Sequence, residues 1–305
     1  MTTTGSTSDF NHCLVCGSIN LKRMPRYAPH FLVSCQNCSF VFSSRNPSVK
    51  ELNSVYSAYH RGSVIPTPIT FYKMNRLASS LMRLRQINTA LDVGCGDGDL
   101  IVCFKEYGVS VYGTEYDATS AMIAANKGVK ILSGGLQPYA PEGVKGFDLI
   151  VFTEVIEHVN NPKDILAHFF KLLEPGGLLY ITTPNFCSIE SKLLGPNWGM
   201  IGYPEHLCYY CPKTLHRLLI NAGFEKVSLV TKNISVFRFV QFWLKKNTVN
   251  DLIVDPEKAS SAAQEAFHSN IILRMAKCFI NKLLAATGMG SSLRAIYKRP
   301  LRSVL

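Results

Sequence analysis

The sequence predicts an α/β fold: a central sheet with helices on both faces, a small N-terminal unit and a C-terminal helical insertion. Two segments carry the prediction of the sheet. Residues 90–98 are Ala-Leu-Asp-Val-Gly-Cys-Gly-Asp-Gly, an apolar strand that runs through an acid into a glycine turn. Residues 110–115, Ser-Val-Tyr-Gly-Thr-Glu, form a second strand that ends in a carboxylate. Two Cys-x-x-Cys pairs near the N-terminus define the small unit.

The glycine turn predicts a ligand site at the end of the first strand. Glycine is needed where the backbone adopts a positive φ or closely approaches a ligand. Glu115 follows the turn by about 20 residues, where an acid can accept hydrogen bonds from ribose hydroxyls. The Gly-x-Gly-x-Gly spacing fits a nucleoside without a pyrophosphate better than a dinucleotide. The alternative is that the glycines serve only the packing of a strand against a helix.

These residues resemble the glycine motif and the second-strand acid of the class I S-adenosylmethionine (SAM) methyltransferases. The resemblance continues through Phe147–Phe152 as the fourth strand, and through Leu173–Gly177 and Ile181–Asn185 around the fifth strand, covering about residues 88–232. It implies a Rossmann-like sheet that binds SAM, with Glu115 on the ribose. The cofactor-binding residues expected from it are Asp92, Gly94, Cys95, Gly96, Gly98, Glu115 and Glu154.

The cysteine pairs predict a zinc ribbon over residues 1–46. Cys13 and Cys16 are separated by two residues, and Cys35 and Cys38 repeat that spacing after a gap of 18 residues. Two such pairs supply the four thiolates of a closed tetrahedral zinc site, so we expect structural zinc and no zinc catalysis. Disulfides or redox chemistry are the alternatives. So small a unit buries little core, and the metal would supply much of its folding free energy.

Residues 47–87 are predicted to form a helical linker or lid, and residues 88–305 the SAM-binding domain. Ser48 and Glu51 have the spacing of a capping box at a helix start. Residues 56–86 should be helical over the SAM site, with interruptions at Pro66 and Pro68. This layout of a ribbon followed by a helix resembles a bacterial methyltransferase subgroup associated with surface polysaccharides and glycans.

The segment after the fourth strand carries the candidate catalytic groups. If it is helical, Glu154, Glu157 and His158 share one face and could hold a divalent cation or form an acid/base pair. The segment resembles the Glu-x-x-Glu-His motif of ubiquinone-biosynthesis O-methyltransferases and small-RNA 2′-O-methyltransferases, which implies metal binding. His206 is the plausible counterpart of the further histidines in the RNA enzymes, and a second candidate base. The alternative is that the two glutamates are solvated and His158 packs at the sheet edge.

A long loop after the fifth strand is rich in aromatic residues. Trp198, Tyr203, Tyr209 and Tyr210 could stack on a sugar or another ring, or could pin the loop to the core. The spacing of Cys208 and Cys211 is interpreted as coincidence. The cysteines predicted to be small apolar packing residues are Cys95, Cys103, Cys187 and Cys278.

The C-terminal part is predicted to contain strands at 225–232 and 292–298, separated by a helical insertion at about 234–290. Within the insertion, residues 236–246 and 271–286 mix apolar and basic side chains. Such helices can lie on an anionic membrane surface; the alternative is packing on the sheet or on a second subunit. No apolar run reaches the length of a membrane span and no signal peptide is recognised, so we predict a cytoplasmic location, with peripheral contact at the inner membrane face as an option.

Charge distribution bears on the acceptor. Residues 1–89 hold ten basic and two acidic side chains, residues 90–230 hold ten and fifteen, and residues 231–305 hold twelve and four. Two basic flanks around an acidic centre suit an anionic partner. We therefore predict a SAM-dependent methyltransferase that O-methylates a hydroxyl of a sugar or glycan precursor, with His158 and His206 as base or orienting groups. The alternatives are a quinone precursor, an RNA, or a catalytically silent zinc-ribbon adaptor; nucleic acid is not the favoured partner.

Overall fold

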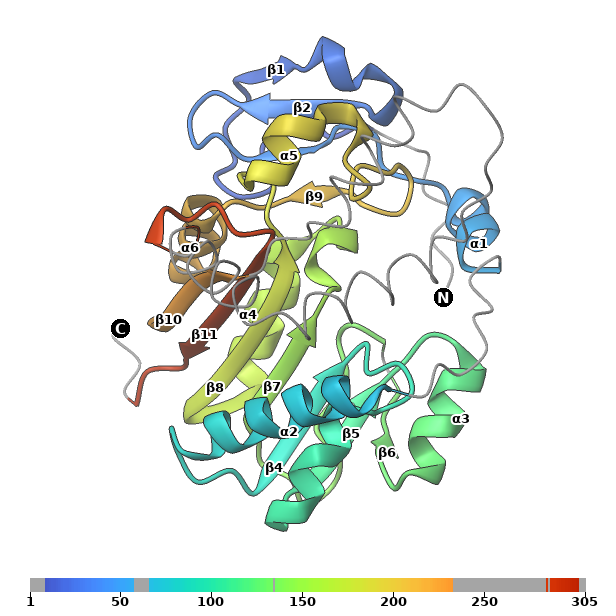
Figure 1. The fold of residues 1–305 in the computed structure, drawn as a ribbon, viewed down its shortest axis with the longest axis vertical. Coiled ribbons are helices and arrows are strands. Elements are labelled where there is room, and N and C mark those ends of the chain that lie inside the picture. Colours follow the sequence, from blue (N-terminus) through green and yellow to red (C-terminus); the bar gives the residue numbers. More distant parts are fainter. Residues whose placement is uncertain (1–8, 58–65, 134, 233–283, 285, 302–305) are drawn as a thin grey trace, which may run out of the picture.

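The computed structural model describes residues 9–57, 66–133, 135–232, 284 and 286–301 (Figure 1). Its strands are β1 (Leu21–Arg23), β2 (Leu32–Cys35), β3 (Val41–Ser43), β4 (Thr89–Val93), β5 (Ser110–Thr114), β6 (Lys130–Ile131), β7 (Phe147–Thr153), β8 (Leu173–Pro184), β9 (Cys208–Tyr209), β10 (Glu225–Lys232) and β11 (Ser292–Lys298). Its α-helices are α1 (Val49–Ser57), α2 (Pro68–Met82), α3 (Ala118–Asn126), α4 (Pro162–Leu172), α5 (Ile189–Leu194) and α6 (Pro212–Asn221). Its 3₁₀ helices are η1 (Pro25–His30), η2 (Ile101–Tyr107), η3 (Ile156–His158) and η4 (Gly195–Asn197).

The central sheet has seven strands in the order β10-β11-β8-β7-β4-β5-β6. The strands from β8 to β6 are parallel, whereas β11 is antiparallel to both of its neighbours, β8 and β10. The predicted α/β fold with a Rossmann-like sheet is therefore confirmed. The carboxyl ends of β4, β5 and β7 lie at one edge of the sheet, where ligands bind in open parallel sheets.

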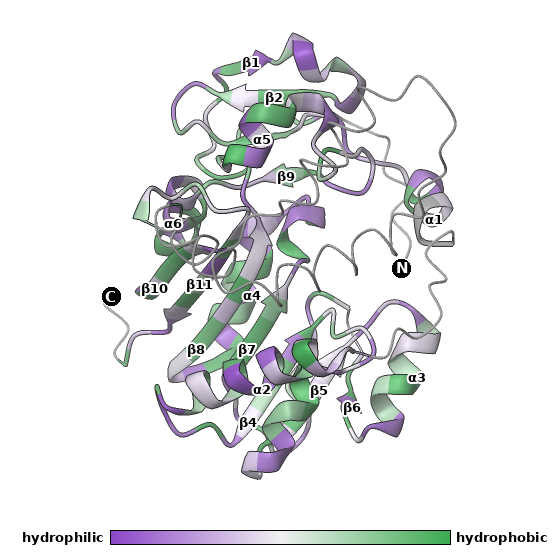
Figure 2. Cartoon of the chain, in the orientation of Figure 1, coloured by the Kyte–Doolittle hydropathy of each residue, from purple (hydrophilic) through white to green (hydrophobic). Residues whose placement is uncertain are grey.

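Each face of the sheet is covered by its own apolar cluster. Leu81 of α2 and Phe104 of η2 pack on one face, against Val111 and Leu149. On the other face, α4 and α6 pack against side chains such as Phe152. Figure 2 shows hydrophobic residues along central strands such as β7. This arrangement explains the nearly continuous apolar pattern of β7, which is buried on both sides.

The linker contains helices α1 and α2, and Pro68 has a role other than the predicted interruption of a helix. Glu51 accepts a hydrogen bond from the backbone N–H of Ser48 at 2.8 Å and donates its own N–H to the Ser48 hydroxyl, so the predicted capping box is present. Pro68 does not interrupt a helix: it is the first residue of α2, whose N-cap Thr67 accepts from the N–H of Thr70. Proline fits a first helical turn because that N–H has no intrahelical partner.

The N-terminal unit is joined to the larger unit by a shared sheet. Its three strands and β9 form a sheet in the order β1-β2-β3-β9. Strand β9 belongs to the loop after β8. Figure 1 shows this arrangement, with the blue strands β1 and β2 beside the yellow elements α5 and β9. Cys13, Phe40 and Phe42 of the N-terminal unit belong to the same apolar cluster as Phe152 of β7.

The predicted helical insertion at about 234–290, with its basic amphipathic segments, lies mostly outside the described residues. Its flanking strands, β10 and β11, have the predicted bounds. Among the residues that the structure describes, no helix combines the length and the apolar character needed to cross a bilayer.

Candidate active site and cysteine cluster

The glycine turn is built so that Glu115 holds it in place. The N–H groups of Gly94 and Cys95 both donate to the carbonyl oxygen of Thr114 at 2.9 Å, which ties the turn to β5. The Glu115 carboxylate accepts from the backbone N–H of Gly96 at 2.8 Å, of Tyr116 at 2.7 Å and of Asp117 at 2.9 Å. Glu115 and the glycine turn are thus neighbours joined through backbone groups, and the binding of ribose by Glu115 stays a prediction.

Asp92 lies below the turn, 2% exposed. Its Oδ1 has no hydrogen-bond partner among the residues that the structure describes. Burial, and to a smaller extent the charge of Glu115, raise the pKa of Asp92 from 3.8 to about 7. A buried carboxylate oxygen without a partner fits a cationic ligand, and SAM carries both a sulfonium and an ammonium group. Gly96 agrees with that fit: its φ is +52°, and a Cβ added there would meet no atom within 4 Å.

Two further side chains shape the turn. The Cys95 side chain packs on Gly113 so closely that a Cβ at residue 113 would lie 2.7 Å from its Sγ. Cys95 therefore contributes to this site through its backbone and its packing, and burial raises the pKa of its thiol to about 12. Lys127 donates to the carbonyl oxygen of Asp97 at 2.8 Å and pairs with Asp99. Sequence reasoning did not identify Lys127, because no motif marks it.

Glu154 does not share a helical face with Glu157 and His158, so that prediction is wrong. Strand β7 ends at Thr153, and Glu154 adopts a left-handed φ of +53° while its N–H donates to the Thr182 carbonyl at 3.0 Å. Between β7 and α4 the chain forms only the short 3₁₀ helix η3. As a result Glu154 is exposed at the sheet edge, whereas Glu157 is 3% exposed. Among the described residues, the carboxylate of Glu154 is therefore not one of the grouped potential metal ligands described next, although its charge acts on Glu157.

Glu157, His158 and His206 come together: one ligand atom from each lies within 4.8 Å of the others. Glu157 accepts a hydrogen bond from the hydroxyl of Thr183 at 3.0 Å. Burial, followed by the nearby charge of Glu154, raises the pKa of Glu157 to about 8. The rings of the two histidines have centroids 4.7 Å apart, although the residues lie on different segments of the chain.

Backbone contacts fix the available nitrogen of both histidines. Nδ1 of His158 lies 2.8 Å from the carbonyl oxygen of Glu205, and Nδ1 of His206 lies 2.6 Å from that of Met200. A carbonyl can only accept, so each Nδ1 carries the proton and each Nε2 keeps its lone pair when the ring is neutral. Burial and the neighbouring His206 lower the pKa of His158, which favours the neutral ring. This is the orientation found in metal-ligating histidines.

The glycine turn and this cluster are neighbours. Strands β4 and β7 are paired, and a Cβ added at Gly94 would lie 2.8 Å from Cγ2 of Val155. The segment that carries Glu157 and His158 therefore lies directly against the turn. A methyl donor in the turn and an acceptor at the cluster would meet at this edge.

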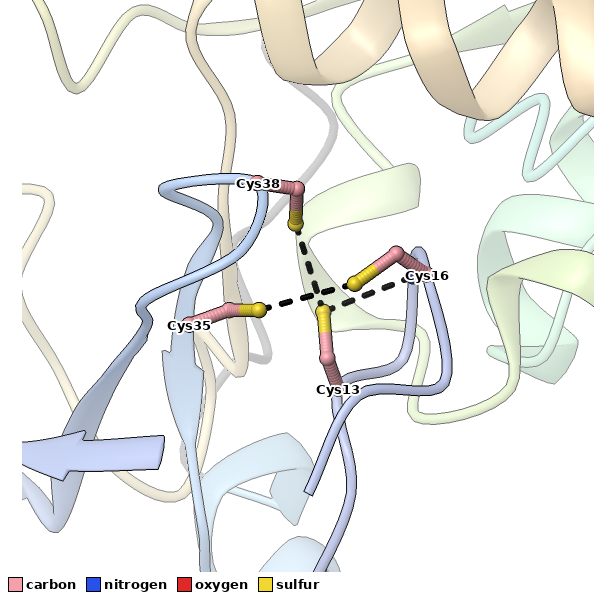
Figure 3. Close-up of side chains that lie close together, drawn as sticks. All are labelled: Cys13, Cys16, Cys35 and Cys38. Carbon is pink, nitrogen blue, oxygen red and sulfur yellow. Dashed lines mark hydrogen bonds between the residues drawn. The ribbon is translucent and has the colours of Figure 1, made fainter. Parts of the chain in front are cut away.

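The four N-terminal cysteines point toward one another (Figure 3). Their sulfur atoms all lie within 4.8 Å of one another, with Cys13–Cys38 and Cys16–Cys35 contacts of 3.5 Å. A tetrahedral zinc site with Zn–S bonds of about 2.3 Å needs sulfur separations of about 3.8 Å. The arrangement fits four-thiolate coordination with little movement, and the zinc itself remains a prediction.

The aromatic residues of the loop after β8 divide into two groups. Trp198, Tyr209 and Tyr210 are at most 4% exposed and pack in the interior, so these three pin the loop. Tyr203 is half-buried and contacts the ring of Phe31 with centroids 5.0 Å apart.

The prediction for Cys187 is wrong: this residue forms a disulfide with Cys211, with Cα atoms 5.3 Å apart. The bond closes a loop that includes α5 and His206. Cys208, by contrast, is a free buried cysteine, so its spacing from Cys211 has no role of its own. Cys103 is buried in the apolar core and Cys95 packs against it, and neither forms a disulfide, in agreement with their predicted packing role; Cys278 lies outside the described residues.

The fold and the glycine-turn site together define a class I SAM-dependent methyltransferase. A family profile described as "Methyltransferase domain" matches residues 70–229, more than half of the chain. The chain therefore belongs to this methyltransferase family. The matched region contains the glycine turn and both histidines, and excludes the four-cysteine unit.

Named relatives agree with this class. The chain is 28% identical over 193 residues to a ubiquinone biosynthesis O-methyltransferase of Idiomarina loihiensis, covering 61% of this chain and 74% of the relative. It is 30% identical over 195 residues to a protein of the same name from Chelativorans sp., covering 60% and 72%. Several other relatives of that name match over less than half of their own length.

A solved structure shares the fold. The complex between the Haloferax volcanii Trm112 methyltransferase activator and a methyltransferase superimposes with a TM-score of 0.52, at 14% identity, over 85% of this chain and 100% of that one.

Proposed function

We propose that this methyltransferase transfers the SAM methyl group to a hydroxyl oxygen of a phenolic quinone precursor. The names of the relatives support this alternative better than the sugar or glycan acceptor that the charge distribution suggested. The adaptor alternative is set aside because the chain is a methyltransferase. A small-molecule acceptor is consistent with the family.

The observation that carries the proposal is the convergence of Glu157, His158 and His206 beside the glycine turn. Three groups with lone pairs face a common point, and no hydrogen bond between any two of them is found in the described structure. Such a set fits a divalent cation, because oxygen and imidazole nitrogen are suitable ligands for Mg²⁺ or Mn²⁺ and related ions. When bound, the cation would supply Lewis acidity that lowers the pKa of an acceptor hydroxyl.

The chain's own groups have defined tasks in this scheme. His158 and His206 present Nε2 because their Nδ1–H groups are held by carbonyl oxygens, and Thr183 orients the Glu157 carboxylate. Asp92 and Glu115 hold the cationic donor at the turn. The acceptor hydroxyl gives up its proton to solvent; in-line attack of its oxygen on the methyl carbon then forms the ether, breaks the carbon–sulfur bond and leaves a neutral thioether. Positioning of the two reactants is then the main contribution of the protein.

The test is methyl transfer from labelled SAM to two acceptors, a catechol and a sugar, with and without added Mg²⁺ or Mn²⁺. We expect label in the catechol ether only, and only when the cation is present. The variant H206Q should lose this transfer. His168 contacts the carbonyl of Pro138 and is not one of the grouped ligands, so H168Q is the matched control. Label in the sugar alone would refute the proposed acceptor. Cation-independent transfer would refute the metal role, and its loss in H206Q but not in H168Q would assign His206 as a base instead.

A further inference from the structure

The four-cysteine unit is connected to the histidine cluster through backbone hydrogen bonds. Strand β3 pairs with β9, with Val41 opposite Tyr209 and Phe42 opposite Cys208. One residue further along, the N–H of Ser43 donates to the carbonyl of Leu207 at 2.8 Å. The N–H of Leu207 in turn donates to the carbonyl of Glu157 at 2.8 Å. The backbone of Leu207, which directly follows His206, therefore joins the ribbon to Glu157.

The metal-binding turn determines where β3 lies. The N–H of Cys35 donates to the carbonyl of Phe40 and that of Ser39 donates to the carbonyl of Cys35, both at 2.8 Å. These bonds form the second Cys-x-x-Cys turn, and β3 begins three residues after Cys38. A metal that fixes the sulfur atoms of Cys35 and Cys38 would consequently fix the start of β3.

Side-chain packing makes the connection rigid. Phe40, Phe42 and Tyr210 are fully buried. The ring of Phe40 lies 5.6 Å from that of Phe42 and 5.1 Å from that of Tyr210, measured between centroids. Buried aromatic contacts of this kind resist displacement because a shift of β3 would open a cavity in a shared core.

The ribbon also holds the loop on the other side of His206. The N–H of Tyr203 lies 3.4 Å from Nδ1 of His30, and the Arg45 guanidinium lies 5.5 Å from the Tyr203 ring. Arg45 itself forms a 3.0 Å ion pair with Glu51. Tyr203 precedes His206 by three residues, so the ribbon contacts the loop on both sides of this histidine.

We propose that the zinc ribbon is a positioning element of the methyltransferase site: its metal orders β3, and β3 places His206 against His158 and Glu157. The role of His206 in this statement rests on the function proposed above, whereas the coupling between ribbon and loop does not. Metal binding supplies folding free energy to a small unit. Here it would also stabilise the folded conformation of residues 203–209, because these residues contact the ribbon. Among the described residues, no backbone hydrogen bond joins the ribbon to the turn at Asp92 and Glu115, so this turn should respond less than residues 203–209.

The experiment compares the full chain with zinc, the same protein after chelation and zinc return, and the variant C38S. The matched control is C103S, because Cys103 is a buried free cysteine on the opposite face of the sheet. Zinc content is measured for each protein. Amide hydrogen exchange is then followed for residues 203–209 and 89–98, together with Mn²⁺ and SAM affinity.

We expect loss of zinc to accelerate exchange at residues 203–209 by about tenfold or more and to weaken Mn²⁺ binding, because local order there depends on β3. Exchange at 89–98 and SAM affinity should change by less than about twofold, because the backbone of this segment is held by β5 and Glu115 rather than by the ribbon. Zinc return should restore the chelated protein, and C103S should resemble the wild type.

Two results would overturn the inference. The first is a wild-type protein that holds no zinc, and the second is unchanged exchange at 203–209 after zinc is lost. A failure of the proposed function looks different: exchange at 203–209 still follows zinc, but no Mn²⁺ binds and no methyl group reaches the acceptor.

Discussion

Nδ1 of His206 lies 2.6 Å from the carbonyl oxygen of Met200, which leaves Nε2 of this histidine facing Glu157 and His158. The carbonyl of Met200 thus determines which nitrogen His206 presents, and a substitution of His206 should remove one ligand while leaving the rest of the cluster in place.

For H206Q we therefore expect Mn²⁺ affinity to fall by about 100-fold or more, because loss of a residue that only orients a ligand already costs about 10- to 100-fold, with SAM affinity unchanged. Equilibrium dialysis with Mn²⁺ and calorimetry with SAM are the measurements. If H206Q and H168Q bind Mn²⁺ equally well, the cluster is not a metal site.

The raised pKa of Asp92 predicts a pH dependence of SAM binding. At pH 6 most of the Asp92 carboxyl is protonated because its pKa is about 7, whereas a cationic donor favours the ionised form. SAM affinity should consequently rise between pH 6 and pH 8. In D92N the affinity should be lower and should lose this rise. Calorimetry at both pH values checks the prediction, and an equal rise in D92N would contradict it.

The raised pKa of Asp92 also predicts how the free energy of unfolding of the ligand-free protein depends on pH. The folded chain keeps the Asp92 proton up to about pH 7, whereas the unfolded chain releases it near pH 3.8. Between these values the folded state binds more protons, so the contribution of Asp92 to the free energy of unfolding decreases as pH rises. D92N should remove that decrease. Urea unfolding of both proteins at pH 5 and pH 7.5 measures the difference.

The disulfide between Cys187 and Cys211 should stabilise the fold by restricting the unfolded chain. The two residues are 24 positions apart. Closing a loop of this length is worth about 3 kcal/mol in the chain-entropy account. C187S should accordingly lower the free energy of unfolding by an amount of that order, measured by urea unfolding. C103S is again the control, and a C187S protein as stable as C103S would show that the bond contributes little.

Features carried by short segments could be predicted from the sequence. Asp92, Gly96 and Glu115 lie within 25 residues of one another, and a strand, a turn and an acid at that spacing leave few alternatives for the fold. The four cysteines were found in the same way, because Cys-x-x-Cys brings its own two thiols together.

Features that depend on contacts between distant segments could not be predicted from the sequence. The assumption of a helix after Thr153 failed because Glu154 turns the chain with a positive φ, and one reversed residue changes which side chains share a face. His206 and His158 lie 48 positions apart, and the loop that carries His206 is joined to β3 through pairs such as Phe42 with Cys208, which no local sequence pattern indicates. Nothing near Cys187 or Cys211 indicates that they form a pair.

Two glycines of the turn should respond differently to alanine, because one faces protein and the other faces open space. Both have a positive φ, +78° at Gly94 and +52° at Gly96, so each substitution costs about 1 kcal/mol of backbone strain. At Gly94 the new methyl group would also lie 2.8 Å from Cγ2 of Val155, and that branched side chain is packed against the apolar core. G94A should therefore unfold at clearly lower urea concentration than G96A. At Gly96 the methyl group meets no protein atom, so G96A should keep most of its stability but lose SAM affinity, because the group would occupy the space assigned to the donor. Urea unfolding and SAM calorimetry on the two variants form the test. If G96A binds SAM as the wild type does, the donor does not lie over Gly96.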